Sequence, residues 1–222
     1  MDALFRESKV KLKRALQFID EVDAGLQAYD ASDPISARFE GASLKIDIKE
    51  IDPNVLSALG DAIHNMRAAL DLMASELARV NGKSDKDVHF PFANSKENFP
   101  DQIRSKNFDR AGDDVVALVK TFEPYSDGNK ILRAIHDLDI RDKHRNIIVT
   151  RRTTNNLQLS YRLDKGPNPP VSVSASNVHE FLDGALAGQP IITTLKDLVR
   201  LVNGIIEAFT DMVEQRHAKP RR

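Results

Sequence analysis

The sequence contains no cysteine, and this absence excludes several kinds of chemistry. Without cysteine the chain has no disulfide bond, no zinc–thiolate site and no thiol nucleophile, and it suits a reducing cytoplasm. It also lacks any uninterrupted run of about 18 apolar residues, the length that a membrane-spanning helix needs. The charged residues that begin at Arg6 do not fit a signal peptide. We therefore expect a cytoplasmic protein with no membrane partner.

An excess of charge of one sign is missing as well. The chain has 32 Lys and Arg residues against 33 Asp and Glu residues, a formal net charge of -1. No global field therefore steers it toward nucleic acid or an anionic membrane, and such binding needs a local patch. The sequence also lacks the glycine-rich signatures of P-loop and dinucleotide-binding proteins and the Gly-x-Ser-x-Gly elbow of hydrolases. These classes are excluded, and we expect no cofactor.

Apolar residues three and four positions apart predict that helices dominate this chain of 222 residues, 41% of which are hydrophobic. The spacing indicates long helices over 2–30 and 53–80 and another that follows Pro190. Shorter helices are expected within 112–123 and from 127–130 onward, the latter with Ile131, Ile135 and Leu138 on one face. Residues 83–110, which include a Phe-Pro-Phe sequence, predict an ordered loop that can contain a short helix.

Alternating apolar residues predict two β insertions between these helices. One is a hairpin within 35–50 that turns at Glu40-Gly41. The other, over 146–174, consists of three short strands separated by turn-like segments at 153–156 and 165–170. The expected fold is therefore α+β but mainly α. It is a single domain over 1–216 built on a bundle of about four long helices, with a basic tail at 217–222.

Three polar residues lie in one stripe of the second long helix, beside its apolar face. His64, Arg67 and Asp71 are three and four positions apart, so Arg67 and Asp71 can pair along the helix. Ionisable groups next to a core need a partner or a function, because burial disfavours the charged form. The stripe is therefore either part of a functional site or a half-buried ion pair that fixes the register of the helices.

A second polar cluster continues the apolar face of the helix expected after 130. The 131, 135, 138 spacing leads to Asp142 and Arg145, so charged residues take positions that would otherwise face the core. The segment 141–152 is the most positive part of the chain and includes Arg141, Lys143 and His144. This segment could bind a phosphate. Alternatively, it is a solvated helix end whose cations complement the helix dipole.

The two clusters meet at one end of the core if the two helices are neighbours. The stripe 64–71 would then face 142–145, either in an open pocket or in a closed polar network. His136, Asp139 and Asp142 also offer metal ligands, although their spacing matches no recognised metal site.

Several motifs resemble those of known families. The segment 60–71, the Phe-Pro-Phe loop and Asp142-Lys143-His144-Arg145 resemble a widespread family of uncharacterised bacterial proteins over most of the chain. A more distant resemblance is to the HEPN superfamily, which comprises helical bundles that are often dimeric and in many members are metal-independent ribonucleases. Residues 145–150 are similar to its Arg-polar-x-x-x-His motif, with Thr150 in the position of the His, and the Ala-rich helix at 53–80 is similar to its bundle helices.

Together the motifs and the resemblance predict a bacterial protein that binds RNA, a nucleotide or another phosphate, and the resemblance also implies a homodimer. If it cleaves RNA, we expect His144 and Arg145 to be catalytic, with His64 as a second proton-transfer group. The expected binding residues are Arg67, Asp71, Arg141, Asp142 and Lys143. Two alternatives stay open. One is a non-catalytic interaction or dimerisation module with a structural polar network, and the other is a metal-dependent hydrolase that uses His136, Asp139 and Asp142.

Overall fold

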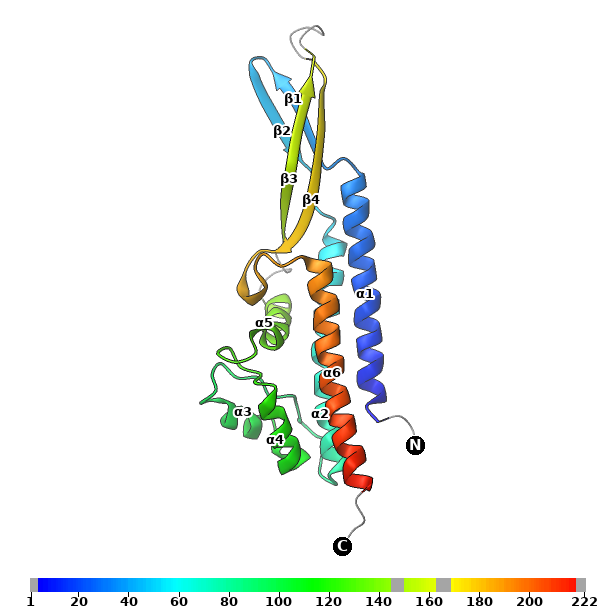
Figure 1. Ribbon diagram of the computed structural model, residues 1–222, viewed down its shortest axis with the longest axis vertical. Coiled ribbons are helices and arrows are strands. Elements are labelled where there is room, and N and C mark those ends of the chain that lie inside the picture. Colours follow the sequence, from blue (N-terminus) through cyan, green and yellow to red (C-terminus); the bar gives the residue numbers. More distant parts are fainter. Residues whose placement is uncertain (1–3, 145–149, 163–168, 219–222) are drawn as a thin grey trace.

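Three long helices, α1 (Arg6–Ala31), α2 (Pro53–Val80) and α6 (Ile191–Ala218), lie side by side and form the body of the molecule (Figure 1). The computed structural model describes residues 4–144, 150–162 and 169–218. Each long helix buries one apolar face, as the spacing of its apolar residues requires. Within the described ranges, no helix is both long and apolar enough to cross a membrane.

The shorter helices pack on one side of this body. They are α3 (Phe99–Ser105), α4 (Asp113–Thr121) and α5 (Lys130–His144), together with the 3-10 turns η1 (Phe108–Ala111) and η3 (Gly184–Leu186). Of these, α5 lies against both α2 and α6. The mainly helical α+β class is confirmed, but the expectation of about four long helices is inexact, because the body formed by the described residues contains three long helices.

Two β-hairpins extend the molecule beyond one end of the helices (Figure 1). Strands β1 (Ile35–Glu40) and β2 (Ser43–Ile48) form the predicted hairpin, which turns at Gly41 with a φ of 61°. Strands β3 (Thr150–Tyr161) and β4 (Val171–Phe181) form the second hairpin. The hairpins pack on each other through β1 and β4, and the rings of Phe39 and Tyr161 meet edge to face with centroids 5.1 Å apart.

The turn predicted at 153–156, which was expected to separate two of three short strands in the second insertion, is wrong. β3 continues through 153–156, where Thr153 pairs with Val178 of β4, and an irregularity between Asn155 and Gln158 absorbs the positive φ of Asn156. β-branched threonine favours an extended strand, and it outweighs the turn tendency of asparagine in this segment. The hairpin also reaches beyond the predicted limit of 174. Residues 147–149, expected as a strand, lie outside the described ranges.

The buried face of α5 differs by one residue from the predicted one. Leu132, Ile135 and Leu138 are buried, whereas Ile131 is exposed. The physical reason is that α5 packs between α2 and α6 with positions 132, 135, 138 and 139 buried, so the residue at 131 faces solvent. This rotation brings Asp139, rather than Asp142, into the buried position.

Candidate functional site

The Phe-Pro-Phe loop at 90–92 is fastened to α2 by a buried ion pair. Arg67 is only 7% exposed, and its guanidinium donates to the Asp71 carboxylate one turn further along and to the Phe90 carbonyl at 3.3 Å. Asp71 in turn accepts a hydrogen bond from the Phe90 backbone N–H at 2.8 Å. Backbone groups of the loop thus complete the pair. This geometry favours a structural role for Arg67 and Asp71 over direct ligand binding.

Phe92, at the end of the same motif, contacts both a cation and an imidazole. The Arg67 guanidinium carbon lies 4.8 Å from the Phe92 ring centroid, and the His136 ring stacks on Phe92 with centroids 4.9 Å apart and planes 11° apart. Burial, followed by the positive charges of Arg67 and Arg133, lowers the pKa of His136 from 6.5 to about 3. His136 is therefore neutral near pH 7.

The tautomer of His136 follows from its surroundings. Its Nδ1 is buried and has no hydrogen-bond partner among the described residues. A neutral imidazole carries one proton, and the form with that proton on Nε2 avoids burying an unpaired donor. His136 is thus a neutral group with an unused acceptor.

Arg133, three residues before His136 on α5, holds the loop from the other side. It is 9% exposed, and its guanidinium donates to the Ala93 carbonyl, to Asn94 Oδ1 at 3.1 Å and, through Nε, to Asp137 Oδ1 at 2.9 Å. One buried cation therefore joins α5 to the loop backbone and orients the Asn94 carboxamide.

A polar pocket of about 310 Å³ opens between this loop, α3 and α5. We call it the carboxamide pocket, and it is lined by Phe92, Asn94, Asn98, Asp101, Gln102, Arg133 and His136. Three carboxamides and a neutral imidazole supply hydrogen-bond donors and acceptors, and one guanidinium supplies positive charge. The pocket can therefore recognise a small polar ligand by hydrogen bonds as well as by charge.

His64 and Asp139 join the two polar clusters of the sequence. His64 Nδ1 lies 2.9 Å from Asp139 Oδ1, and this bond connects α2 to α5. The Asp139 side chain is 8% exposed and the His64 side chain is 43% exposed, so a buried carboxylate orients a half-exposed imidazole. Asp139 also lies one turn beyond His136 of the carboxamide pocket and acts on the pKa of that residue. The expected meeting of the two helices is thus observed, and Asp139 is the residue that bonds to His64.

The remaining predicted site residues take several places. The half-buried Asp142 carboxylate packs against Gly60, where α2 has no side chain to block it. Arg141 points elsewhere, since it forms an ion pair with Asp183, which precedes η3. Lys143 and His144 close α5, but their side chains and all of Arg145 lie outside the described part of the structure.

The hypothesis of a metal site is not supported by the described residues. No three His, Asp or Glu side chains among them gather in a group that could hold a metal ion. His136 stacks on Phe92, whereas Asp139 bonds to His64, so the two side chains serve different partners. Metal-dependent hydrolysis by His136, Asp139 and Asp142 therefore has no support in the part of the chain that the structure describes.

Sequence reasoning missed most of the carboxamide pocket. Asn98 and Gln102 belong to a segment expected mainly as a loop. Arg133 was not recognised because it lies next to the apolar face of α5, where an exposed arginine is ordinary. The available signal was the spacing of Arg133 and His136, which places both on the side of α5 that flanks its buried face. The Phe-Pro-Phe sequence pointed to the loop itself but not to what the loop contacts.

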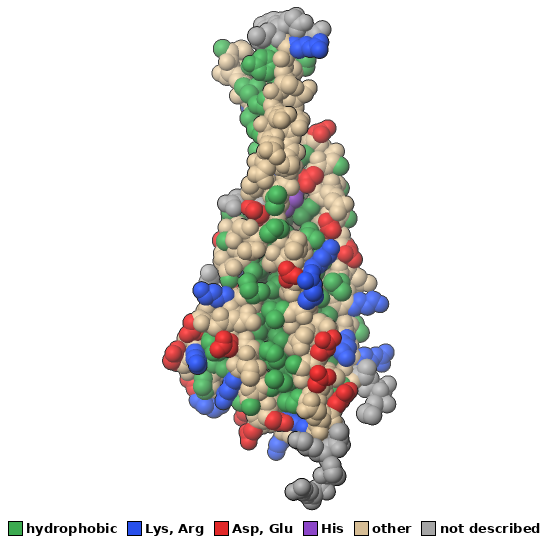
Figure 2. Space-filling view, viewed as in Figure 1, with side chains coloured by type: hydrophobic (Ala, Val, Ile, Leu, Met, Phe, Trp, Pro, Cys, Tyr) green, Lys and Arg blue, Asp and Glu red, His purple; other side chains and the backbone are tan. Residues whose placement is uncertain are grey.

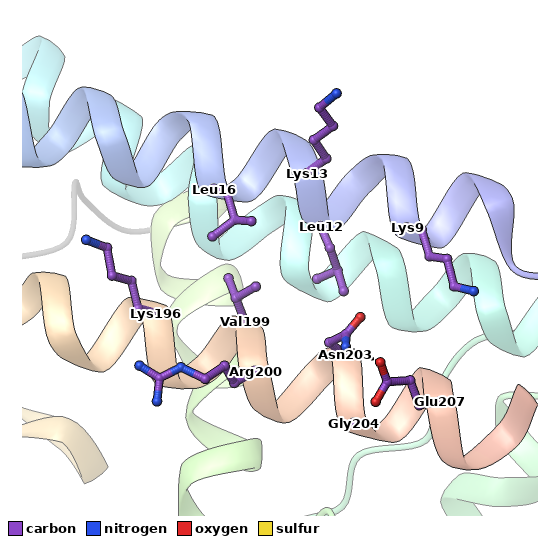
Figure 3. A pocket seen from close by; sticks show the side chains of 10 residues that line it. All are labelled: Lys9, Leu12, Lys13, Leu16, Lys196, Val199, Arg200, Asn203, Gly204 and Glu207. Carbon is purple, nitrogen blue, oxygen red and sulfur yellow. Dashed lines mark hydrogen bonds between the residues drawn. The ribbon is translucent and has the colours of Figure 1, made fainter. Parts of the chain in front are cut away.

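A second, larger pocket of about 550 Å³ lies between α1 and α6. Figure 3 shows Leu16 and Val199 pointing toward one another across it, whereas Lys13 points away into solvent. We call it the basic groove, and it is lined by Lys9, Leu12, Lys13, Leu16, Lys196, Val199, Arg200, Asn203, Gly204 and Glu207. In Figure 2 apolar side chains form a stripe along the body of the molecule, with charged side chains on both sides.

Comparisons of the chain with protein-family models, with curated proteins and with solved structures find no match. The resemblances of residues 60–71 and 145–150 to known motifs therefore stay predictions. The chemistry of the candidate site rests on its own geometry, which consists of the carboxamide pocket and the adjacent His64–Asp139 pair.

Proposed function

We propose that the protein binds a nucleotide, free or as part of an RNA, in the carboxamide pocket. The observation that carries this proposal is the combination, in one polar pocket, of the Arg133 guanidinium, the neutral His136 and three carboxamide side chains. Carboxamides match the paired donors and acceptors on the edge of a base. The Arg133 guanidinium already donates to Ala93, Asn94 and Asp137, so a phosphate would share it with these partners, and the base is the half of the nucleotide that the pocket fits best.

The size of the pocket supports a single nucleotide unit, whereas its charge does not favour an anion. Its volume of about 310 Å³ is at the lower end of the range for small-molecule sites. Asp101 is a carboxylate at the rim and opposes an anionic ligand, although it is paired with Arg104 of the same helix. Recognition therefore depends more on hydrogen bonds to the base than on charge alone.

The His64–Asp139 pair extends the proposal to catalysis. With its Nδ1 bonded to the Asp139 carboxylate, His64 keeps Nε2 for proton transfer, which is the arrangement of a general base. We propose HEPN-like cleavage of RNA, in the bacterial cytoplasm, with His64 in this role and with His144 and Arg145 as its partners. Loss of cleavage in both His64→Ala and His144→Ala would support these roles, and unchanged cleavage of labelled RNA by both variants would exclude them.

Calorimetric titration with the four nucleoside monophosphates and with inorganic phosphate tests binding. At least one nucleotide should bind more tightly than phosphate alone. Gln102→Ala should weaken that binding by about fivefold, since one net hydrogen bond contributes about 1 kcal/mol. Asp101→Asn should tighten it by removing a like charge. The control Asp211→Asn, an exposed site on α6, should change nothing.

Two outcomes of this titration contradict the proposal. One is the absence of any nucleotide binding to the wild-type protein up to about millimolar concentration, where binding free energy is only about 4 kcal/mol. The other is nucleotide binding that Gln102→Ala and Asp101→Asn leave unchanged, because the ligand would then occupy another site.

The basic groove favours a second candidate function, that of an interaction module. Leu16 is exposed on its apolar floor, and Lys9 on the α1 side and Lys196 and Arg200 on the α6 side add positive charge. Such a groove fits an amphipathic helix with acidic flanks, although Asp23 and Asp197 already partly neutralise the α6 side. Binding of an acidic amphipathic peptide that Leu16→Glu abolishes would support this function, and its absence would exclude it.

A further inference from the structure

Strand β2 has an open edge. It pairs with β1 in a sheet of two strands, and no other described strand pairs with its outer side. Figure 1 shows that this hairpin stands beyond the end of the helices, so the edge is not covered by the body of the molecule. An uncovered edge strand offers its backbone N–H and C=O groups to another chain.

The side chains of β2 are unusual for an exposed edge. Leu44, Ile46 and Ile48 are 39%, 44% and 63% exposed and share one face of the strand. Lys45 and Asp47 share the opposite face. Natural edge strands are often short or carry charges, proline or bulges that hinder pairing. β2 is short and carries Lys45 and Asp47 on one face, but its other face is apolar and it contains no proline or bulge.

The alternation of backbone hydrogen bonds along β2 shows which residues point their N–H and C=O groups away from β1. Lys49 donates its N–H to the Pro34 carbonyl at 2.9 Å, so its backbone faces β1. Backbone groups alternate between the two edges of an antiparallel strand, so Asp47 and Lys45 also face β1. The N–H and C=O groups of Ile48, Ile46 and Leu44 therefore point to the open edge.

We propose that β2 pairs antiparallel with β2 of a second copy of this chain, about a two-fold axis at Ile46. The segment Leu44-Lys45-Ile46-Asp47-Ile48 is self-complementary in this register. Ile46 lies opposite its own counterpart, Leu44 lies opposite Ile48, and Lys45 lies opposite Asp47. The outward-facing backbone groups of 44, 46 and 48 are those that this register needs for its hydrogen-bonded pairs.

Neighbouring registers are disfavoured by charge. An axis at Lys45 would place Lys45 opposite Lys45 of the second copy, and an axis at Asp47 would place two Asp47 carboxylates opposite each other. Like charges directly opposite on a sheet destabilise the pair, whereas opposite charges and β-branched apolar pairs stabilise it. Among these registers, only the axis at Ile46 satisfies both faces of the strand.

The resulting four-stranded sheet is small, so the dimer should be weak. Stable interfaces usually bury about 1,200–2,000 Å² in total, and a pair of short strands buries less. We expect a dimer that forms at micromolar or higher protein concentration, with each carboxamide pocket on its own protomer. This dimer does not depend on the proposed function.

A charge-swap experiment tests the register by analytical ultracentrifugation. Lys45→Asp places two like pairs across the axis, as does Asp47→Lys, so each variant alone should dimerise at least tenfold more weakly than the wild type. Mixing the two variants restores both opposite-charge pairs and should restore dimerisation as a heterodimer. Asp47 also pairs with Arg38 within its own hairpin, so circular dichroism must show that each variant is folded.

A cross-linking experiment tests the same axis without weakening the hairpin. The chain has no cysteine, so Ile46→Cys introduces one thiol that faces its own copy. Hydrogen-bonded antiparallel partners have Cα atoms about 5.5 Å apart, within the range of a disulfide. Mild oxidation should give a covalent dimer for Ile46→Cys but not for the control Leu157→Cys, a comparably exposed site on β3. A monomeric wild type at about millimolar concentration, or equal cross-linking of both variants, would overturn the proposal.

Discussion

Acidification should destabilise this protein through one buried histidine, His136. The imidazole stacks on Phe92 near the guanidinium groups of Arg67 and Arg133, so an added proton is both buried and repelled. The Asp139 carboxylate raises the pKa of His136, but burial and the two cations outweigh it. In the unfolded chain the side chain regains its ordinary pKa of 6.5. Below that pH the unfolded state binds a proton that the folded state does not, so stability falls as pH falls.

The size of the effect follows from these two pKa values. The pKa of His136 is 6.5 in the unfolded chain and about 3 in the folded chain, so above about pH 8 the residue is neutral in both states and causes no loss of stability. By about pH 5 the folded state should have lost about 2 kcal/mol, and the loss continues until the pH reaches the folded pKa. A loss of that size is a large fraction of the stability of an ordinary domain.

Urea unfolding of the wild type and of His136→Gln at about pH 8 and about pH 5 measures this contribution. Other titrating groups affect both proteins alike, so the difference between their two pH dependences isolates His136. The wild type should lose about 2 kcal/mol more than the variant on acidification. Equal losses in the wild type and His136→Gln would refute the reasoning.

Three further substitutions test the packing of the long helices. Asp71→Ala should lower the free energy of unfolding by about 3 kcal/mol, because it leaves the buried Arg67 guanidinium uncompensated; urea unfolding should show less than about 0.5 kcal/mol for the exposed control Asp61→Ala. Gly204→Ala should raise stability by up to about 1 kcal/mol, since an added Cβ meets no atom within 4 Å. Gly60→Ala should not gain this, because its Cβ would overlap a carboxylate of the facing helix. Equal thermal midpoints for the two glycine variants would contradict the packing argument.

Periodic patterns of apolar residues were sufficient to predict the long helices and the first hairpin. In α2 the pattern coincided with local signals, since Asp52 caps the helix with a hydrogen bond to Asn54 and Pro53 occupies its first turn. In β3 the two kinds of signal disagreed. Asparagine residues favoured a turn at 153–156, yet cross-strand pairing with β4 kept the segment extended. Local propensity is weak compared with the pairing of a whole hairpin.

The candidate site was predictable only in part, because its contacts join segments that are distant in the sequence. Arg67 and Asp71 were recognisable from their spacing on one helix. Their common partner, the Phe90 backbone, was not, since a backbone group has no sequence signature. Likewise the one-residue rotation of α5 buries Asp139, which bonds to His64 of α2, whereas the half-buried Asp142 lies against Gly60 of α2. Such a rotation depends on side-chain packing across the whole interface.

The two buried arginines couple the carboxamide pocket to the stability of the fold. Arg67 and Arg133 both donate to backbone carbonyls of the loop that carries Phe92 and Asn94. Loss of these hydrogen bonds should therefore disorder the wall of the pocket. Asp71→Ala should therefore lose ligand affinity and stability together, although Asp71 does not line the pocket. Gln102→Ala, by contrast, should lose affinity with unchanged unfolding free energy. Nucleotide titration and urea unfolding of the same two variants separate these outcomes, and full affinity in Asp71→Ala would show that the loop is ordered without the ion pair.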